Sequence, residues 1–390
     1  MKIAAVYGRF CSGGPGVFDV ANLYTSTGKG LTGSESFFWN TVRGLAERGH
    51  EVQAFADVAD EMEHVPTLAG AAAFKLESGG RLRQDVDAVL GWNEPDLLRL
   101  MPPTALRVCV QQLNDFDYCS PDFDQFVDLY AFPSETHRTF MLSHGRRDGM
   151  KLDRAKTVVM PNCLNLEMYD GLESRRPHSV AYCSSPDRGL HWLLEYWPLV
   201  RKQVPDAELR IYYKVEPWLQ GVRGLWWDQG LSEWYEIGFR ARYVEECLRR
   251  LGRAGQHGVH LVGPTPNAEM ARELMRTQVL AYPCDTVRWT EGFSVSIMDA
   301  CAAGCVPIIS DVDAIGEVYG KVAHVIPGRP QSHDQQWVDA IVRGMTDMTF
   351  QAEVTGRTMA FVRQHSREVR AAQWEELLVI EATKRGRRAA

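Results

Sequence analysis

Short apolar runs alternate with amphipathic stretches along the chain. The runs have the length of buried strands, and the stretches between many of them have helical spacing. We expect strands at residues 2–8, 51–55, 86–92, 105–112, 128–134, 179–183, 208–213, 259–265, 279–285 and 324–327, with two more within 156–170 and 304–310. Strands that alternate with helices form a parallel sheet with helices on both faces, so the sequence predicts an α/β protein.

The first predicted strand is followed by a glycine-rich loop and then by a clear helix start. Thr32 and Glu35 have the spacing of a capping box, and Gly49 ends the helix before the next strand. Gly33 and Ser34 therefore lie at the mouth of a helix. They fit either a tight turn or a place where a ligand phosphate or sugar approaches the backbone, and the residues alone leave both interpretations open.

Polar residues follow other predicted strands, where parallel α/β folds carry their functional groups. Asn114 and Asp115 come after the run at 105–112, and Arg188 comes after the run at 179–183 in the loop SSPDRG. A guanidinium at a helix mouth can bind phosphate oxygens in a bidentate manner. Each of these residues also fits a solvated loop end, and the pattern does not decide between the two.

The most informative stretch is TEGFSVSIMDACAAGCVPIIS, from Thr290 to Ser310. We expect a short helix that begins at Ser294, whose hydroxyl caps the first turn, and ends at Gly304. Free amides behind a glycine make such a helix start an anion site. Two acids flank this site, Glu291 before the helix and Asp299 within it.

The spacing of these two acids limits their chemistry. If the segment between Glu291 and Asp299 is mainly helical, its rise separates them by roughly 12 Å. The paired carboxylates of a glycoside hydrolase lie only about 5 to 9.5 Å apart. The pair instead suits the two ends of an extended ligand, such as a hexose and a ribose with a diphosphate between them.

Length, composition and charge narrow the class further. A chain of 390 residues favours two domains, and 45% hydrophobic residues are typical of a globular protein. The net charge of −7 argues against a general nucleic-acid binder. Nine scattered cysteines, no signal peptide and no long apolar run indicate a cytoplasmic protein without a transmembrane segment. Basic residues near the carboxyl terminus leave peripheral membrane contact open, and the oligomeric state stays unknown.

Several motifs together resemble one family. The stretch that begins EGFS, with acids eight positions apart, is similar to the donor-binding motif of retaining GT-B glycosyltransferases of family 4. The amino-terminal TGSE and ERGHEV, the segment VVMPNCLN and the loop before GLHWLLEYWP resemble further motifs of that family, in the same order. The resemblance implies two Rossmann-like parallel-sheet domains that face a central cleft.

The resemblance also implies domain roles. An acceptor-binding domain would span 1–168, a donor-binding domain 169–365, and a helix with a basic tail 366–390. That helix would cross back to the first domain. The implied reaction transfers a sugar from a nucleoside diphosphate, UDP- or GDP-linked, to a hydroxyl acceptor with retention of configuration. It requires no metal and no cofactor.

Individual residues take roles from the same resemblance. Arg188 and Glu291 would be the catalytic pair, with Asn114 or Asp115 beside the sugar or acceptor. The expected donor-binding residues are Gly33, Ser34, Ser184, Ser185, Arg188, Gly263, Glu291, Gly292, Phe293, Ser294 and Asp299. Glu291 would hold the transferred sugar, Asp299 the ribose, and Arg188 the leaving diphosphate.

The chain also departs from the family motifs. Asp299 replaces a glutamate, and Ser184 or Ser185 replaces the first arginine of the phosphate loop. These departures keep two alternatives open: a nucleotide-sugar-binding scaffold without activity, and a GT-B epimerase or phosphorylase.

Overall fold

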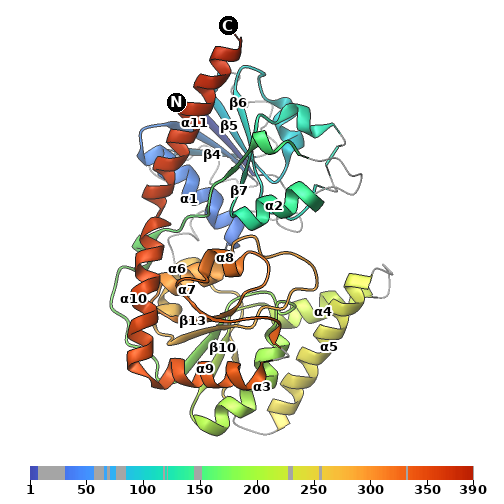
Figure 1. The fold of residues 1–390 in the computed structure, drawn as a ribbon, viewed down its shortest axis with the longest axis vertical. Helices are drawn as coiled ribbons and strands as arrows, with labels where there is room; N and C mark the ends of the chain where they lie inside the picture. The colour runs from blue at the N-terminus through green and yellow to red at the C-terminus, as the bar shows by residue number, and fades with distance from the viewer. Residues whose placement is uncertain are drawn as a thin grey trace. The chain divides into compact units, whose positions relative to one another are not determined.

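The computed structural model shows two compact units, each built on a parallel sheet (Figure 1). It describes residues 1–7, 31–56, 66–67, 71–75, 85–116, 119–120, 122–144, 152–226, 232–253, 257–330 and 333–389. Within these ranges, the first unit comprises residues up to 166 together with 363–389, and the second comprises 167–362. The two units are described separately below.

The described residues of the first unit form an eight-stranded sheet in the order β3-β4-β2-β1-β5-β6-β7-β8, parallel except for the β3–β4 pair. Its strands are β1 Lys2–Tyr7, β2 Glu51–Ala56, β3 Pro66–Thr67, β4 Ala71–Lys75, β5 Ala88–Trp92, β6 Leu106–Val110, β7 Leu129–Phe132 and β8 Thr157–Val159. Its helices are α1 Gly33–Glu47, α2 Glu135–His144 and α11 Arg367–Ala389. The sequence pattern predicted these strands except β3 and β4; the alanine-rich β4 has low strand propensity.

The second unit contains a six-stranded parallel sheet in the order β11-β10-β9-β12-β13-β14 within the described residues. Its strands are β9 Ser179–Tyr182, β10 Glu208–Ile211, β11 Val259–Leu261, β12 Val279–Tyr282, β13 Val306–Ser310 and β14 His324–Ile326. Its helices are α3 Leu190–Gln203, α4 Val215–Trp226, α5 Ser232–Arg253, α6 Asn267–Met275, α7 Val295–Ala302, α8 Ile315–Tyr319, α9 Asp334–Thr346 and α10 Met348–Gln364. Short 3-10 helices lie in the first unit at Pro95–Leu100, Phe123–Phe126 and Arg154–Lys156, and a fourth, Leu166–Tyr169, spans the boundary between the units in sequence. Both sheets have a doubly wound strand order, which agrees with the α/β class that the sequence predicted.

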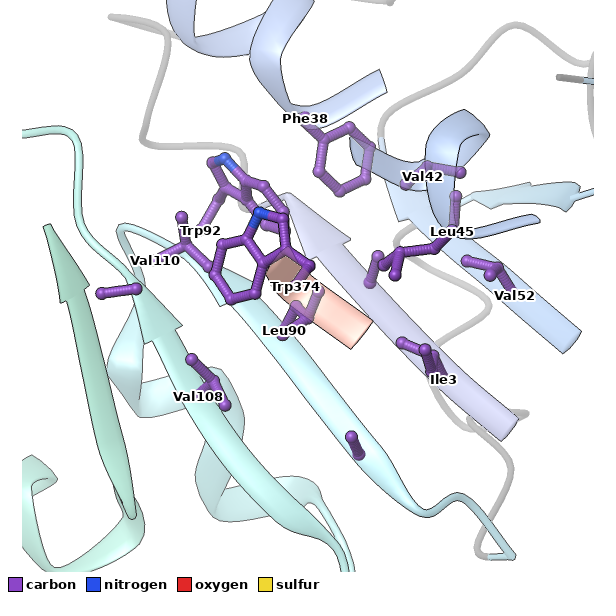
Figure 2. Packing of buried hydrophobic residues seen from close by; sticks show 14 of the residues in the cluster. Ile3, Phe38, Val42, Leu45, Val52, Leu90, Trp92, Val108, Val110 and Trp374 are labelled. Carbon is purple, nitrogen blue, oxygen red and sulfur yellow. The ribbon is translucent and has the colours of Figure 1, made fainter. Parts of the chain in front are cut away.

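The start of α1 confirms the predicted capping box. The amide of Thr32 donates to Glu35 Oε2 at 2.6 Å, and the amide of Glu35 donates to Thr32 Oγ1 at 3.5 Å. Phe38 and Trp92 then pack edge to face, with ring centroids 4.9 Å apart. The apolar face of α1 thus covers the first sheet, and Figure 2 shows part of this core.

The carboxyl-terminal helix α11 belongs to the first unit, although all described residues of the second unit precede it in sequence. Its Trp374 is fully buried in the same core as Leu90 and Trp92 (Figure 2). A Cβ atom on Gly44 of α1 would lie 2.8 Å from Ala371 Cβ, so α1 and α11 meet closely at this glycine. Arg367 Nε donates to Glu47 Oε2 at 2.9 Å and ties the two helices together.

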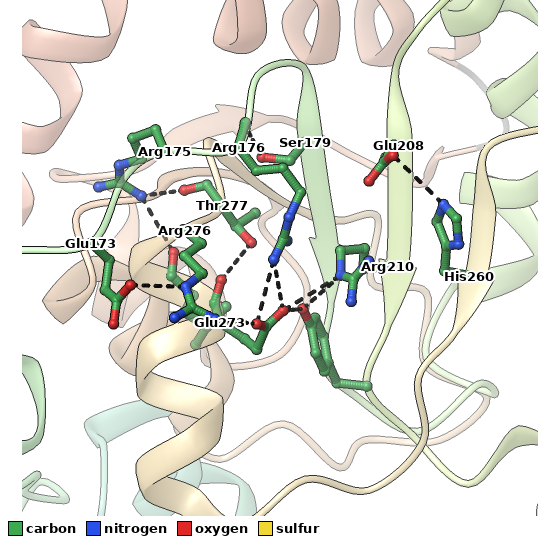
Figure 3. Close-up of polar contacts among 12 residues, drawn as sticks. Glu173, Arg175, Arg176, Ser179, Glu208, Arg210, His260, Glu273, Arg276 and Thr277 are labelled. Atoms are coloured by element: carbon green, nitrogen blue, oxygen red, sulfur yellow. Dashed lines mark hydrogen bonds and ion pairs between the residues drawn. The ribbon is translucent and has the colours of Figure 1, made fainter.

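The segment that enters the second sheet is anchored by a polar network (Figure 3). Glu273 of α6 accepts hydrogen bonds from Arg176 at 3.1 Å, Arg276 at 3.0 Å and the Tyr212 hydroxyl at 2.7 Å. Arg175 donates to the main-chain carbonyls of Ala303 and Gly304, and so holds the end of α7. Arg175 and Arg176 therefore pack within the second unit.

Replacement of Trp374 by alanine tests the contribution of α11 to the first unit. We expect a loss of about 3 to 5 kcal/mol in the free energy of unfolding, because the change removes a fully buried indole. Val379→Ala on the same helix is the control, since Val379 is 48% exposed and should change the free energy by about 0.5 kcal/mol or less. Urea unfolding followed by circular dichroism measures both. Equal effects would contradict the docking of α11 through Trp374.

Candidate functional site

The strand order of the second sheet reverses between β9 and β12, and the loops after these strands carry the predicted site. In doubly wound sheets, ligands bind outside the carboxyl ends of strands at such a reversal. Arg188 lies in the loop after β9, and Glu291 lies in the loop after β12. The fold therefore brings two of the predicted residues to one place.

Arg188 and Glu291 form an ion pair between their side chains. The Glu291 carboxylate is almost fully buried, whereas 31% of the Arg188 side chain is exposed. Arg188 Nη2 also donates to Thr290 Oγ1 at 2.9 Å. A buried carboxylate needs such a partner, because an unpaired charge is costly in a poorly solvated site. The arginine thus compensates the charge of the acid while part of its side chain stays exposed.

Gly189 sets the position of Arg188. Its φ of +99° lies in the left-handed region, and a Cβ atom there would overlap the carbonyl oxygen of Pro283. The β9 loop therefore touches the end of β12 without a side chain between them, which only glycine allows. This close approach places Arg188 beside the loop that carries Glu291.

Asp313, which the sequence did not indicate, fixes the backbone of the Glu291 loop through hydrogen bonds. Its Oδ2 accepts hydrogen bonds from the amides of Thr290 at 2.9 Å and Glu291 at 3.0 Å, and from Thr286 Oγ1 at 3.2 Å. Asp313 itself has a φ of +53°. Aspartate tolerates this conformation better than most residues, and strain of this kind is frequent at functional sites.

The start of α7 differs from the sequence prediction. Ser294 occupies the N-cap position, but its hydroxyl makes no capping hydrogen bond. Its φ of 58° is left-handed, whereas a side-chain cap needs an extended N-cap residue. The Ser294 carbonyl instead accepts from the Tyr319 hydroxyl at 2.9 Å. The amide-rich start of α7 thus lies directly after Glu291, Gly292 and Phe293, and no side-chain cap covers it.

Asp299 lies one turn into α7 and has a different partner. The Tyr169 hydroxyl donates to Asp299 Oδ1 at 2.8 Å. Burial raises the pKa of Asp299 to about 6, and the hydrogen bond from Tyr169 opposes that rise. The two acids of the motif are therefore held by separate groups, which agrees with separate roles.

A buried arginine of the long helix α5 donates hydrogen bonds to the loop after β9 and to the loop after β12. Arg240 Nη1 donates to the main-chain carbonyl of Asp187 at 2.9 Å and also to that of Asp285. Its Nη2 donates to Glu236 at 2.8 Å and lies 3.5 Å from Asp285 Oδ2. Sequence reasoning missed Arg240, because nothing in its local pattern separates it from the surface arginines of the same helix.

Ser184 and Ser185, which the sequence predicted to bind a donor, make hydrogen bonds within the protein. Ser184 Oγ lies 3.0 Å from the Tyr282 hydroxyl, and Ser185 Oγ donates to Asp187. Gly263 follows the edge strand β11 with a φ of +90°. Ser184 and Ser185 thus make hydrogen bonds within or beside the loop, and Arg188 is the residue that supplies the loop with a positive charge.

The predicted residues of the first unit lie at the carboxyl edge of the first sheet. Gly33 and Ser34 form the first turn of α1, and the buried Ser34 hydroxyl has no hydrogen-bond partner among the described residues. Asn114 and Asp115 follow β6, and Asn93 Oδ1 accepts from the amides of Gln112 and Leu113 in the same loop. These residues belong to a different unit from Arg188 and Glu291.

A buried histidine supports the Asn114 loop. His137 Nε2 lies 2.9 Å from the carbonyl oxygen of Leu113. Burial lowers the pKa of His137 to about 4, so the ring is neutral at physiological pH.

The described residues contain no group of three or more His, Cys, Asp and Glu side chains placed to hold a metal ion. None of the helices found in the described ranges is long and apolar enough to cross a membrane.

The two doubly wound units have the GT-B fold. Solved structures with the same fold include AviGT4, a glycosyltransferase involved in avilamycin A biosynthesis, with a TM-score of 0.67, 16% identity and 98% of each chain covered. Sucrose-phosphate synthase from Thermosynechococcus elongatus has a TM-score of 0.66, 12% identity and coverage of 97% of this chain and 98% of that chain. At these identities the likeness concerns the fold alone.

A family model identifies the second unit more closely. The model of glycosyl transferases group 1 matches residues 178–347, from the start of β9 to the end of α9. The region that resembles this family contains Arg188, Glu291 and Asp299. The comparison with curated proteins found no match.

Replacement of Gly189 by alanine tests the geometry of the Arg188 loop. We expect the β9 loop to move away from Pro283, with the domain less stable by more than about 1 kcal/mol, because alanine is strained at this φ and overlaps a carbonyl. Gly221→Ala in α4 is the matched control, since a Cβ atom there meets nothing within 4 Å. Thermal unfolding of both variants measures the difference. Equal stability of the two variants would contradict the close approach.

Proposed function

We propose that this protein is a retaining glycosyltransferase that moves a sugar from a nucleoside diphosphate to a hydroxyl acceptor without a metal ion. The observation that carries the proposal is the Arg188–Glu291 pair at the strand reversal of the second sheet, within the region that matches the model of glycosyl transferases group 1. The amide-rich start of α7 lies next to this pair. Together they supply a carboxylate that can accept hydrogen bonds from sugar hydroxyls, a fixed cation and an anion site.

In this proposal, Glu291 binds hydroxyl groups of the transferred sugar. Its carboxylate is held by Arg188, and its backbone is held by Asp313. Sugar hydroxyls are donors, and a carboxylate accepts strong hydrogen bonds from them. A fixed acid at this point would orient the anomeric carbon relative to the leaving phosphate.

Arg188 and the α7 amides would stabilise the leaving diphosphate. Negative charge develops on the departing phosphate oxygen as the glycosidic bond breaks. A guanidinium and helix amides held beside that oxygen would lower the barrier, because they need no reorganisation when the charge appears. Protein groups would thus take the part that a divalent cation plays in other transferases.

Two further structural relatives support a uridine nucleotide as the first donor to test. One, from Burkholderia vietnamiensis, is a UDP-forming α,α-trehalose-phosphate synthase, with a TM-score of 0.61 and 11% identity. The other is the pneumococcal O-GlcNAc transferase GtfA, whose structure holds UDP and GlcNAc. Guanosine nucleotides form the second group, because the loops that would contact the base do not distinguish the two.

The acceptor would bind at the first sheet. Asn114 and Asp115 follow β6 in a loop held by Asn93 and His137, and they offer hydrogen-bonding groups for a hydroxylated acceptor. Asn114 and Asp115 would make the first unit the acceptor side of the proposed enzyme.

A nucleotide-sugar-binding scaffold is the second candidate. It is favoured by the single arginine of the phosphate loop, where Ser184 and Ser185 are engaged in internal hydrogen bonds. A scaffold would bind a nucleotide sugar and gain thermal stability from it without turnover.

The donor reaction separates these candidates. With a panel of UDP- and GDP-sugars, we expect slow release of nucleoside diphosphate onto water, detected by mass spectrometry. Arg188→Ala and Glu291→Ala should each lower the rate by about tenfold to a hundredfold, because each removes a group that stabilises the transition state. Arg249→Ala on the surface of α5 is the control and should keep the wild-type rate. Stabilisation by ligand without release in the wild type would favour the scaffold.

A further inference from the structure

Tyr169 occupies an unusual place beside the site. It ends the short 3-10 helix Leu166–Tyr169, well before β9 in sequence, yet its hydroxyl reaches Asp299 on α7 at 2.8 Å. Both residues belong to the second unit and both are partly buried. The contact joins the segment that enters the unit to the second acid of the proposed donor site.

We propose that Tyr169 is a positioning residue for donor recognition, which holds Asp299 so that its carboxylate can bind the ribose of the nucleotide. The inference rests on the proposed function and names the residue that orients the shorter acid, Asp299. Tyr169 engages Oδ1, and no hydrogen bond to Oδ2 is present among the described residues. One carboxylate oxygen is therefore fixed while the other can accept from a ribose hydroxyl.

The chemistry of the pair suits this role. Burial is the main cause that raises the pKa of the Tyr169 phenol well above its usual value, with the Asp299 charge as a further cause. The phenol therefore stays protonated and acts as a donor to the acid. A hydrogen bond to a charged acceptor is stronger than one between neutral groups, so the phenol restricts the carboxylate to one orientation. Aspartate has one methylene less than the glutamate of the family motif, and a fixed orientation is correspondingly more important for it.

The surroundings of Asp299 make its charge depend on pH. The titratable groups that face it are the phenols of Tyr169 and Tyr319 and the thiols of Cys183 and Cys301, all with raised pKa values and therefore neutral near pH 6. No cation acts on the acid among the described residues. Burial raises the pKa of Asp299 to about 6, so its charged form is lost as pH falls through that value.

Steady-state kinetics of the Tyr169→Phe enzyme test the inference. We expect the donor KM to rise by about three- to tenfold, as for the loss of one hydrogen bond, with kcat changed by less than about twofold. The ribose lies away from the bond that breaks, so the loss weakens the ground and transition states equally. Tyr130→Phe is the matched control, because it removes a phenol–aspartate hydrogen bond of 2.7 Å within the first unit and should leave KM unchanged.

Two further readouts separate positioning from general damage. The wild-type donor KM should rise as pH falls through about 6, and Tyr169→Phe should move this inflection to higher pH, since the bond to Tyr169 lowers the pKa of Asp299. Tyr169→Phe combined with Asp299→Asn should be no worse than Asp299→Asn alone, because the phenol acts through the acid.

Calorimetry with nucleotides tests the inference without turnover. Removing the 2′- or 3′-hydroxyl of UDP or GDP should weaken binding to the wild type and have a smaller effect on Tyr169→Phe. An unchanged or lower donor KM in Tyr169→Phe would overturn the inference, the latter by showing that the phenol competes with the ribose. So would an equal deoxyribose effect in both proteins, or no binding of either nucleotide. A wild type that binds nucleotide without transfer would instead refute the proposed activity alone.

Discussion

The ion pair between Arg188 and Glu291 is the interaction on which the site depends. A carboxylate as deeply buried as Glu291 needs a fixed opposite charge, and the arginine comes from the loop of the neighbouring strand. The ion pair therefore requires the loop after β9 and the loop after β12 to stay at a fixed distance from each other. Gly189 permits their contact, Asp313 holds the backbone of Glu291, and Arg240 donates to both loops from α5.

The sheet explains why these groups meet at this point. β9 and β12 are neighbours, but the chain leaves them toward opposite sides, so their carboxyl ends leave room for a ligand. The α7 amides lie at the same edge, where two strained residues, Ser294 and Asp313, also lie. Backbone strain persists only where the surroundings enforce it, and here it coincides with the predicted ligand site.

The sequence predicted the parts of this arrangement that local patterns encode. The α1 capping box and most strands follow from short-range spacing, and Arg188, Glu291 and Asp299 follow from a motif that keeps its order. Asp313, Arg240 and Tyr169 act through contacts between segments far apart in the chain, which no local pattern reveals. The cap predicted at Ser294 was wrong because tertiary contacts of the loop impose a left-handed backbone on a residue whose type favours an ordinary cap.

Direct binding of nucleotide is the most decisive measurement for this account. Isothermal titration calorimetry of UDP and of GDP should show one of them binding to the wild type with one site per chain, and Arg188→Ala should weaken that affinity at least about tenfold. The account would be contradicted by the absence of binding for both nucleotides, or by equal affinity in the wild type and Arg188→Ala.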